Sequence, residues 1–266
     1  MEKVTKIVVM AKQVPDTRNV GKDAMTPEGT VNRAALAAIF NPEDLNALEL
    51  ALQMKDRIGS ATVHVLTMGP QRAADIIREA MFRGADGGYL LSGKEFAGSD
   101  TLATSYALSC ALRKINPDII VAGRQAIDGD TAQVGPQVAE HLDLPQVSYV
   151  ENLEFDGTTF TLKKWLEDGY QIVEVESPCV ITVLSSANQP RYMRMRGIME
   201  AYKREVEVWG CDRIDVDESK LGLKGSPTRV AKSFTKGVKG SGEKFEVSEA
   251  EAVEIIINKL KEKHII

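Results

Sequence analysis

One stretch of the sequence, residues 119–142, constrains the fold more than any other. An apolar run at residues 119–122 leads into a polar loop with glycines at 123 and 129, and a helical pattern begins at Gln137. A strand, a glycine-containing turn and a helix in this order bring backbone N–H groups to the carboxyl end of a sheet, where phosphorylated ligands bind. The stretch therefore predicts a parallel α/β fold in which this loop holds the pyrophosphate of a nucleotide.

Pro136 supports this prediction, because a proline in the opening turns of a helix leaves nearby backbone groups seeking other partners. Two aspartates leave a second interpretation open. The charges of Asp128 and Asp130 would repel an anion unless these residues face a sugar or cap the following helix, and an Asp beside a helix start is typically a cap. A Gly-rich strand-to-helix turn that binds nothing is therefore the alternative.

The first half of the chain alternates short apolar runs with helical patterns. The expected strands lie at residues 6–11, 61–68, 89–91 and 119–122, and the expected helices lie at 42–58, 71–82, 99–116 and 137–142. Five such alternations in roughly 145 residues predict a doubly wound parallel sheet of the Rossmann-like, adenine-nucleotide-binding kind. Its ligand site would lie outside the carboxyl ends of the strands, near Lys12, Met68 and Gly69. Leu102 is expected to face the core.

Several residues near this edge also have a structural explanation. Ala11 is small where the first strand meets its loop, which favours either a nearby adenine or ribose or tight packing on a helix. Asn41 and Asp44 stand at a helix start, so both are explained as capping groups. Pro15 is expected to end ladder pairing after the first strand, because it has no N–H to donate. A small hairpin or ordered loop is expected around Gly29.

The pattern changes after residue 146. Alternating strands are expected at residues 147–155, 158–166 and 170–175, with hairpin signals at Asp156-Gly157 and Asp168-Gly169. They predict a small antiparallel meander within residues 147–176, followed by a buried strand at 179–185.

Methionine and arginine alternate within residues 188–200, just before a helix expected from Gly197. Met193 and Met195 are interleaved with Arg194 and Arg196. Thioether and guanidinium groups are typical of adaptable protein-docking surfaces. A half-buried edge strand whose arginines face water is the alternative.

The last part of the chain reads as an arm followed by a helix. Residues 220–244 are rich in Lys, Gly and Ser, so they are expected to form an extended arm that orders only against another surface. Ser248 and Glu251 form a capping box that opens a final amphipathic helix. We therefore divide the chain into an α/β domain (1–219) and an arm with a helix (220–266), which packs on a partner subunit or folds back on the chain's own sheet.

Composition excludes several classes of function. A net charge of −5 argues against nucleic acid as the main partner, and no apolar run approaches the roughly 20 residues of a membrane span. The absence of a signal-peptide core at the start, together with widely spaced cysteines, predicts a cytoplasmic protein with reduced thiols. The histidines are too scattered to predict a metal site. The cysteines and histidines are Cys110, Cys179, Cys211, His64, His141 and His264.

At this point the residues resemble the beta subunits of electron-transferring flavoproteins. The resemblance covers nearly the whole chain and is most specific in the central loop. The segments that carry it are IVVMAKQVPDT (7–17), NPEDLNALE (41–49), MGP (68–70), GRQAIDGDTAQVG (123–135) and QPRYMRMRGIM (189–199).

The resemblance implies a heterodimer with an alpha subunit that carries its own FAD. It also implies that residues 188–200 dock on acyl-CoA dehydrogenases or related flavoenzymes, with Met195 as the apolar anchor. The implied docking residues are Tyr192, Met193, Arg194, Met195, Arg196 and Ile198. The implied nucleotide pocket comprises Ala11, Lys12, Asn41, Asp44, Met68, Gly69, Gly123, Arg124, Gln125, Ala126, Asp128, Gly129, Asp130, Thr131, Ala132, Gln133, Val134 and Gly135.

The family has two branches, which differ in the nucleotide of this pocket. Respiratory members hold a structural AMP, whereas members from anaerobes and nitrogen fixers hold a second FAD that takes hydride from NADH and splits the electron pair. Residues 12–17 and 128–136 resemble the second branch, so FAD is expected and AMP is the alternative. The implied acceptors are a ferredoxin or flavodoxin and, through the alpha-subunit flavin, a dehydrogenase.

The implied chemistry is electron transfer, so no side chain is expected to act as a catalytic nucleophile or proton donor. Arg124 is the candidate for charge compensation beside the pyrophosphate, and a solvated arginine is the alternative.

Overall fold

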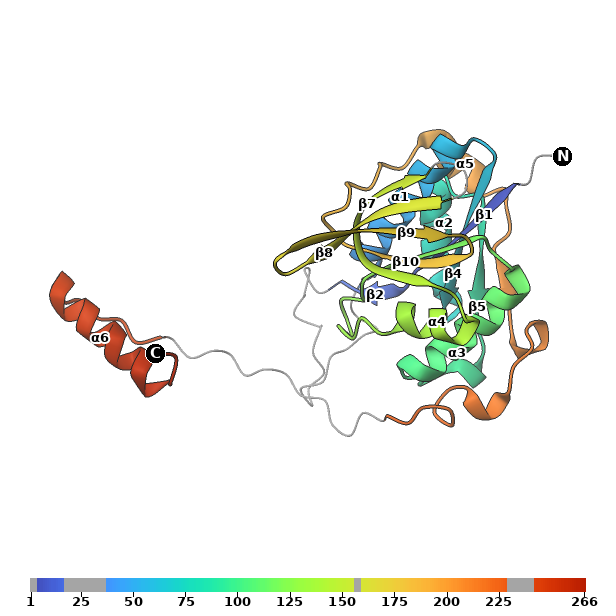
Figure 1. Cartoon of the computed structure of the whole chain (residues 1–266). Helices are drawn as coiled ribbons and strands as arrows, with labels where there is room; N and C mark the ends of the chain where they lie inside the picture. Colours follow the sequence, from blue (N-terminus) through green and yellow to red (C-terminus); the bar gives the residue numbers. More distant parts are fainter. Residues whose placement is uncertain (1–3, 17–36, 156–158, 229–241) are drawn as a thin grey trace.

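The computed structural model describes residues 4–16, 37–155, 159–228 and 242–266. A central mixed sheet is covered by helices on both faces, and a two-stranded sheet lies beside it (Figure 1). The strands are β1 (Thr5–Met10), β2 (Gln13–Pro15), β3 (Ala38–Phe40), β4 (Ala61–Met68), β5 (Gly87–Leu91), β6 (Ile119–Gly123), β7 (Gln146–Phe155), β8 (Thr159–Leu166), β9 (Gly169–Glu176), β10 (Cys179–Val183) and β11 (Glu207–Trp209). The α-helices are α1 (Pro42–Ile58), α2 (Ala74–Arg83), α3 (Thr101–Ile115), α4 (Val134–Leu142), α5 (Met195–Ala201) and α6 (Glu249–Glu262).

The strand order shows that the sheet is doubly wound. Its nine strands run β11-β5-β4-β1-β6-β10-β7-β8-β9, and all neighbours from β11 to β7 pair in parallel. From β1 the chain winds outward through β4 and β5, and then returns to place β6 on the other side of β1. The order therefore reverses between β1 and β6, which is where sheets of this class bind ligands.

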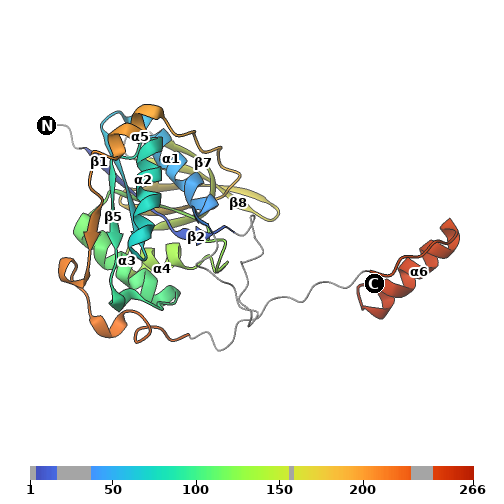
Figure 2. The same cartoon turned by 180° about the vertical axis from the view of Figure 1, so that it is seen from behind.

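Alternating side chains of the central strands pack into two separate hydrophobic cores, one on each face of the sheet. Ile7 and Val9 of β1 pack with α1 and α2 on one face, whereas Val8 packs with α3 and α4 on the other. Figure 2 shows α1 and α2 together on the first of these faces. Burial of each such aliphatic side chain stabilises the folded state by about 2 kcal/mol. The prediction that Leu102 faces the core is wrong. This residue is 42% exposed, because it lies in the first turn of α3 on the side away from the sheet.

Pro15 does not end ladder pairing, so that prediction is wrong. Residues 13–15 form β2, and Pro15 pairs with Ala38 of antiparallel β3. A proline lacks only the backbone donor, so it is accommodated at the last position of a strand in a two-stranded sheet. The loop expected around Gly29 lies outside the described residues.

The predicted meander is confirmed, and it extends the main sheet. Strand β7 pairs in parallel with β10 on one side and antiparallel with β8 on the other, and β8 pairs antiparallel with β9. Leu166 pairs with Gly169, so the second turn consists of residues 167 and 168, and Gly169 already begins β9. The first hairpin signal, at 156–157, lies outside the described residues.

The C-terminal region begins packed and ends apart from the sheet. Leu221 is buried in the core on the α3 side, and the Ser226 hydroxyl donates to the Gly222 carbonyl, so the residues up to 228 pack on the α/β body rather than forming an arm from 220. The capping box of Ser248 and Glu251 is present at the start of α6. Figures 1 and 2 draw α6 apart from the sheet.

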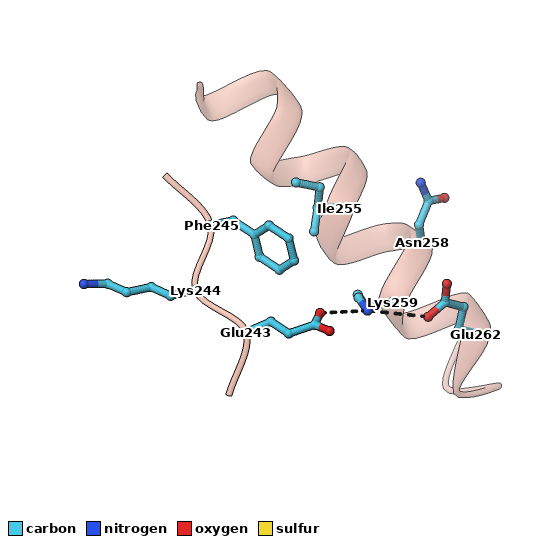
Figure 3. A pocket seen from close by; sticks show the side chains of 7 residues that line it. All are labelled: Glu243, Lys244, Phe245, Ile255, Asn258, Lys259 and Glu262. Atoms are coloured by element: carbon cyan, nitrogen blue, oxygen red, sulfur yellow. Dashed lines mark ion pairs between the residues drawn. The ribbon is translucent and has the colours of Figure 1, made fainter. Parts of the chain in front are cut away.

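The segment before α6 turns back along it. Phe245 faces Ile255 across a groove, and the Lys259 ammonium lies 2.9 Å from a Glu243 carboxylate oxygen (Figure 3). Val253 and Ile256 on the same helix are exposed. Nothing else in the described part of the chain covers them. No described helix is long and apolar enough to cross a membrane.

Candidate functional site

The loops that follow β1 and β6 meet at the point where the strand order reverses. The Lys12 ammonium lies 2.7 and 2.9 Å from the two carboxylate oxygens of Asp128, so an ion pair joins the two loops. Asp130 accepts a hydrogen bond from the Gln125 amide at 2.9 Å. Neither aspartate caps α4, whose N-cap is Gln133 without a side-chain cap. The capping alternative for these two aspartates is therefore wrong.

The first turn of α1 holds both loops through Asp44. Its carboxylate accepts from the backbone N–H of Lys12 at 2.8 Å and of Gly123 at 3.1 Å. These two residues follow or end neighbouring strands, so one buried carboxylate joins the carboxyl ends of β1 and β6.

Two more side chains of this turn hold the loop after β6. Glu43 accepts from the Gln125 N–H at 3.0 Å and from the Arg124 guanidinium at 2.8 Å. The Asn41 amide donates to the Gln125 carbonyl at 2.9 Å and accepts from the Ile127 N–H at 3.1 Å. Asn41 occupies the N-cap position of α1 but makes no side-chain cap bond. The explanation of Asn41 and Asp44 as capping groups is thus wrong, because their side chains bond to distant loops.

The first turn of α1 leaves no room for a side chain at Gly123. A Cβ atom at 123 would lie 2.5 Å from the Asp44 carboxylate and 2.7 Å from the carbonyl carbon of Glu43. Gly129 differs, since a Cβ atom there would meet nothing within 4 Å. Open space at Gly129 is compatible with a ligand that approaches this part of the loop.

The location of the predicted anion site is narrowed by the backbone N–H groups that have no acceptor in the described residues. The N–H groups of Gly123, Gln125 and Ile127 are bonded to α1. No group in the described ranges accepts from the N–H groups of residues 131–133, which lead into the start of α4. Asp130 and Ala132 adopt φ values of 48° and 53°, a left-handed conformation that costs about 1 kcal/mol or more in non-glycine residues. Turns of this kind turn successive N–H groups toward one point, where an anion can bind.

The charges around the site are mostly paired. Burial raises the pKa of Asp44 to about 7, although hydrogen bonds from Lys12 and Gly123 act in the opposite direction. Arg124 pairs with Glu43 and its side chain is 35% exposed, so it is not a freely solvated arginine. A phosphorylated ligand would meet two cations, Lys12 and Arg124, that already have carboxylate partners.

The structure brings most of the predicted pocket residues to one edge of the sheet. Lys12, Asn41, Asp44 and the loop from 123 to 130 are joined by the contacts above, and Ala11 precedes Lys12 and donates its N–H to the Leu66 carbonyl. Met68 and Gly69 lie at the same edge, at the end of β4, where the Gly69 N–H donates to the Leu91 carbonyl. Within the residues that the structure describes, no cluster of side chains suits a metal ion.

The predicted docking residues are exposed, except for the half-buried Ile198, and they do not form a strand. Tyr192 is 92% exposed and Met195 is 78% exposed. Helix α5 begins at Met195, two residues earlier than expected. The alternative of a half-buried edge strand is therefore wrong.

Reasoning from sequence missed Glu49 of α1, as well as the bonds that Glu43 makes to the loop after β6. Both are buried although glutamate usually faces water. The available signal was their position on α1. Asn46 and Glu49 lie among the leucines of this helix, which recur every three or four residues. Polar groups on a buried helix face need buried partners.

A doubly wound sheet with polar loops at its switch point defines a nucleotide-binding α/β protein. The electron transfer flavoprotein domain matches residues 28–212. The chain therefore belongs to the electron transfer flavoprotein family and is one of its beta subunits.

Three relatives show how far the similarity extends. The electron transfer flavoprotein subunit beta of Clostridium acetobutylicum is 51% identical over 260 residues, covering 98% of this chain and 99% of the relative. The acryloyl-CoA reductase electron transfer subunit gamma of Anaerotignum propionicum is 48% identical, covering 98% and 100%. The caffeyl-CoA reductase-Etf complex subunit CarD of Acetobacterium woodii is 44% identical, with the same coverage.

Proposed function

We propose that this beta subunit binds FAD and that its complex with the alpha subunit takes hydride from NADH. The complex would send one electron to a ferredoxin or flavodoxin and the other, through the alpha-subunit FAD, to an acyl-CoA dehydrogenase-type flavoenzyme. The second candidate is a subunit that holds a structural AMP and transfers electrons without splitting the pair. Both candidates need the same adenylate and phosphate contacts.

The observation that carries the proposal is the backbone at the end of the β6 loop. The N–H groups of residues 131–133 lack partners in the described part of the chain, and left-handed residues at 130 and 132 shape the turn. Such a turn suits a diphosphate, and Lys12 and Arg124 supply positive charge nearby. A Cβ atom at Gly129 would meet nothing within 4 Å, so this part of the loop leaves room for a ligand.

The names of the relatives support the branch of the family. Two of the three compared proteins are named as subunits that serve acryloyl-CoA reductase or caffeyl-CoA reductase. A flavoenzyme that acts on CoA thioesters is therefore the acceptor that we propose for this chain.

Counting nucleotides in the purified heterodimer tests the proposal. Two FAD per heterodimer, with bleaching of flavin absorbance on addition of NADH, is the expected result. One FAD together with one AMP would refute the assignment and favour the second candidate. Thr131→Pro removes one of the free N–H groups and should lower nucleotide content, whereas Thr131→Ser keeps it and serves as the control.

We propose that residues 242–266 pack on the alpha subunit. Exposed Val253, Ile256 and Ile257 on α6 form an apolar surface, and such a surface is typical of a protein interface. Deletion of residues 242–266 should weaken heterodimer formation by at least tenfold in analytical ultracentrifugation. An unchanged dissociation constant would contradict this.

We further propose that residues 188–200 dock on the acceptor flavoenzyme. Exposed methionines beside Arg194 and Arg196 support this, because such side chains adapt to a partner surface. The double variant Arg194→Glu with Arg196→Glu should slow electron transfer to an acyl-CoA dehydrogenase while flavin content stays intact. Unchanged transfer would remove these residues from the docking surface.

A further inference from the structure

The docking segment, residues 188–200, is held to helix α1 by an ion pair whose carboxylate is buried and whose guanidinium is partly exposed. Glu49 is 6% exposed, and its carboxylate accepts three hydrogen bonds from Arg191. They come from the backbone N–H at 3.0 Å, from Nε at 2.8 Å and from Nη2 at 3.1 Å. The same guanidinium also lies 3.0 Å from Asp56, which is largely exposed.

A second pair of residues, Asn46 of α1 and Asn188, holds the chain just before Arg191. The Asn46 amide donates to the Asn188 carbonyl at 2.7 Å and to the Ser185 carbonyl at 3.3 Å. In return, the Asn188 amide donates to the Asn46 carbonyl at 3.0 Å. Residues 185–191 are therefore fixed to α1 by side chains that reach the backbone in both directions.

The far side of the docking segment is held by helix α2. The Phe82 carbonyl accepts from the Arg194 N–H at 2.9 Å, and the Arg83 guanidinium donates to the Arg191 carbonyl. A Cβ atom at Gly197 would lie 2.6 Å from the Phe82 carbonyl oxygen. The start of α5 is thus in direct backbone contact with the end of α2.

The Glu49–Arg191 pair stays charged near neutral pH. Burial alone would raise the pKa of Glu49, but the hydrogen bonds from Arg191 lower it below its ordinary value. The same hydrogen bonds raise the pKa of Arg191. A buried pair with several well-aligned hydrogen bonds restricts the backbone that carries it.

We propose that Glu49 and Arg191 are positioning residues that hold residues 192–200 in the conformation that binds the acceptor flavoenzyme. Neither side chain has to touch the acceptor; they hold Tyr192, Met193 and Met195 outward on a preformed surface. Preformed surfaces bind more tightly, because less conformational entropy is lost on association. This inference rests on the proposed docking function, and it adds the residues that set the geometry of that surface.

Hydrogen exchange in the intact heterodimer tests the positioning role. Glu49→Gln keeps the size of the side chain but removes its charge. Exchange at the Arg194 and Ile198 amides, which are bonded to the Phe82 and Arg194 carbonyls, should accelerate at least tenfold, while the amides of β1 and β6 stay within twofold. Asp56→Asn alters the exposed partner of the same arginine and should change exchange at Arg194 and Ile198 less than twofold. Unchanged exchange in Glu49→Gln overturns the proposal.

Arg191→Lys keeps the test valid if Glu49→Gln fails to fold. A lysine retains the charge but cannot make the forked contact, so the same two amides should exchange roughly three- to tenfold faster. Exchange rates equal to wild type in this variant also overturn the proposal.

Steady-state kinetics separate a positioning role from a general loss of stability. With an acyl-CoA dehydrogenase as acceptor, Glu49→Gln should raise KM for the dehydrogenase at least fivefold and leave kcat within twofold. Reduction of the small dye 2,6-dichlorophenolindophenol, which needs no docking, should be unchanged. Faster exchange with an unchanged KM would contradict the link to docking. A wild-type complex that reduces the dye but not the dehydrogenase would instead contradict the proposed docking function.

Discussion

Two buried carboxylates on one helix, Asp44 and Glu49, support two different surfaces by different means. Each is 6% exposed. Asp44 bonds to backbone N–H groups and has its pKa raised to about 7 by burial, whereas Glu49 bonds to a guanidinium that lowers its pKa against the effect of burial. The difference teaches that the charge of Asp44 changes near neutral pH, while the charge of Glu49 stays fixed. We call the Asp44 end of α1, beside the proposed nucleotide site, the nucleotide end, and the Glu49 end, beside the proposed docking segment, the docking end.

Helical geometry explains why one element can serve both surfaces. Five residues along an α-helix correspond to a rotation of about 140° and a rise of about 7.5 Å. Asp44 therefore faces the ends of β1 and β6, and Glu49 faces the segment that leads to α5. The predictions below test whether the two ends of α1 behave independently.

The largest effect is expected from removing the charge partner at the docking end. Glu49→Ala leaves Arg191 with only its exposed partner, Asp56, and loss of one member of a buried pair typically costs about 3 kcal/mol. Urea unfolding of the heterodimer should show a loss of this size, and nucleotide content should remain unchanged. A loss below about 1 kcal/mol would mean that the pair behaves as a surface salt bridge.

The next largest effect is expected at the nucleotide end. Gly123→Ala places a methyl group against the first turn of α1, an overpacking that should lower the free energy of unfolding by about 2 kcal/mol and reduce nucleotide content. Gly129→Ala is the matched control for the free energy of unfolding alone, because its methyl group meets no protein atom within 4 Å. Equal losses of unfolding free energy in the two variants would contradict the close contact between Gly123 and α1.

A pH titration should separate the two carboxylates. The pKa of Asp44 rises from 3.8 in the unfolded chain to about 7 in the fold, so the folded state binds this proton more tightly. Its contribution to stability is therefore full below about pH 4 and is lost as the pH rises through about 7.

Asp44→Asn removes this dependence. Between pH 5 and pH 8, its free energy of unfolding relative to wild type should improve by roughly 2 to 3 kcal/mol. Glu49, whose pKa is lowered, should give Glu49→Gln no such change over the same interval. Parallel curves for Asp44→Asn and wild type, measured by urea unfolding at each pH, would contradict the raised pKa.

The smallest effects are expected from the exposed partners at each end. Lys12→Gln at the nucleotide end and Asp56→Asn at the docking end remove ion pairs that are largely open to solvent. Each should cost about 0.5 kcal/mol or less and become undetectable in about 1 M salt. A cost several times larger at either end would mean that the exposed ion pair is the main interaction that stabilises that end.

The sequence could predict the fold because its signals are local. The alternation of apolar runs with helical patterns predicted the central parallel strands, the Asp-Gly pairs predicted the meander, and Ser248 with Glu251 predicted the cap of α6. Strand β11 was not predicted, since three residues that pair only with β5 carry too little pattern.

The candidate site could be located from the sequence, but the roles of its residues could not. Helical periodicity treats Glu43 and Glu49 as solvent-facing, and their partners are far away in the chain. Glu49 and Arg191 are separated by 142 positions, and Asp44 and Gly123 by 79. Only the folded chain shows that Gly123 makes room for a helix and that Asp44 bonds to the backbone of two loops.

The contact between Gly197 and the Phe82 carbonyl divides the docking helix into a constant and an exchangeable part. No larger residue fits at 197 without moving α5, whereas Tyr192, Met195 and Met199 are surrounded by solvent. Under the docking role that we propose, lineages that adopt a different electron acceptor can diversify these outward side chains while inheriting the attachment to α2 unaltered. Grafting the outward residues of one such subunit onto another then tests whether they direct its electrons.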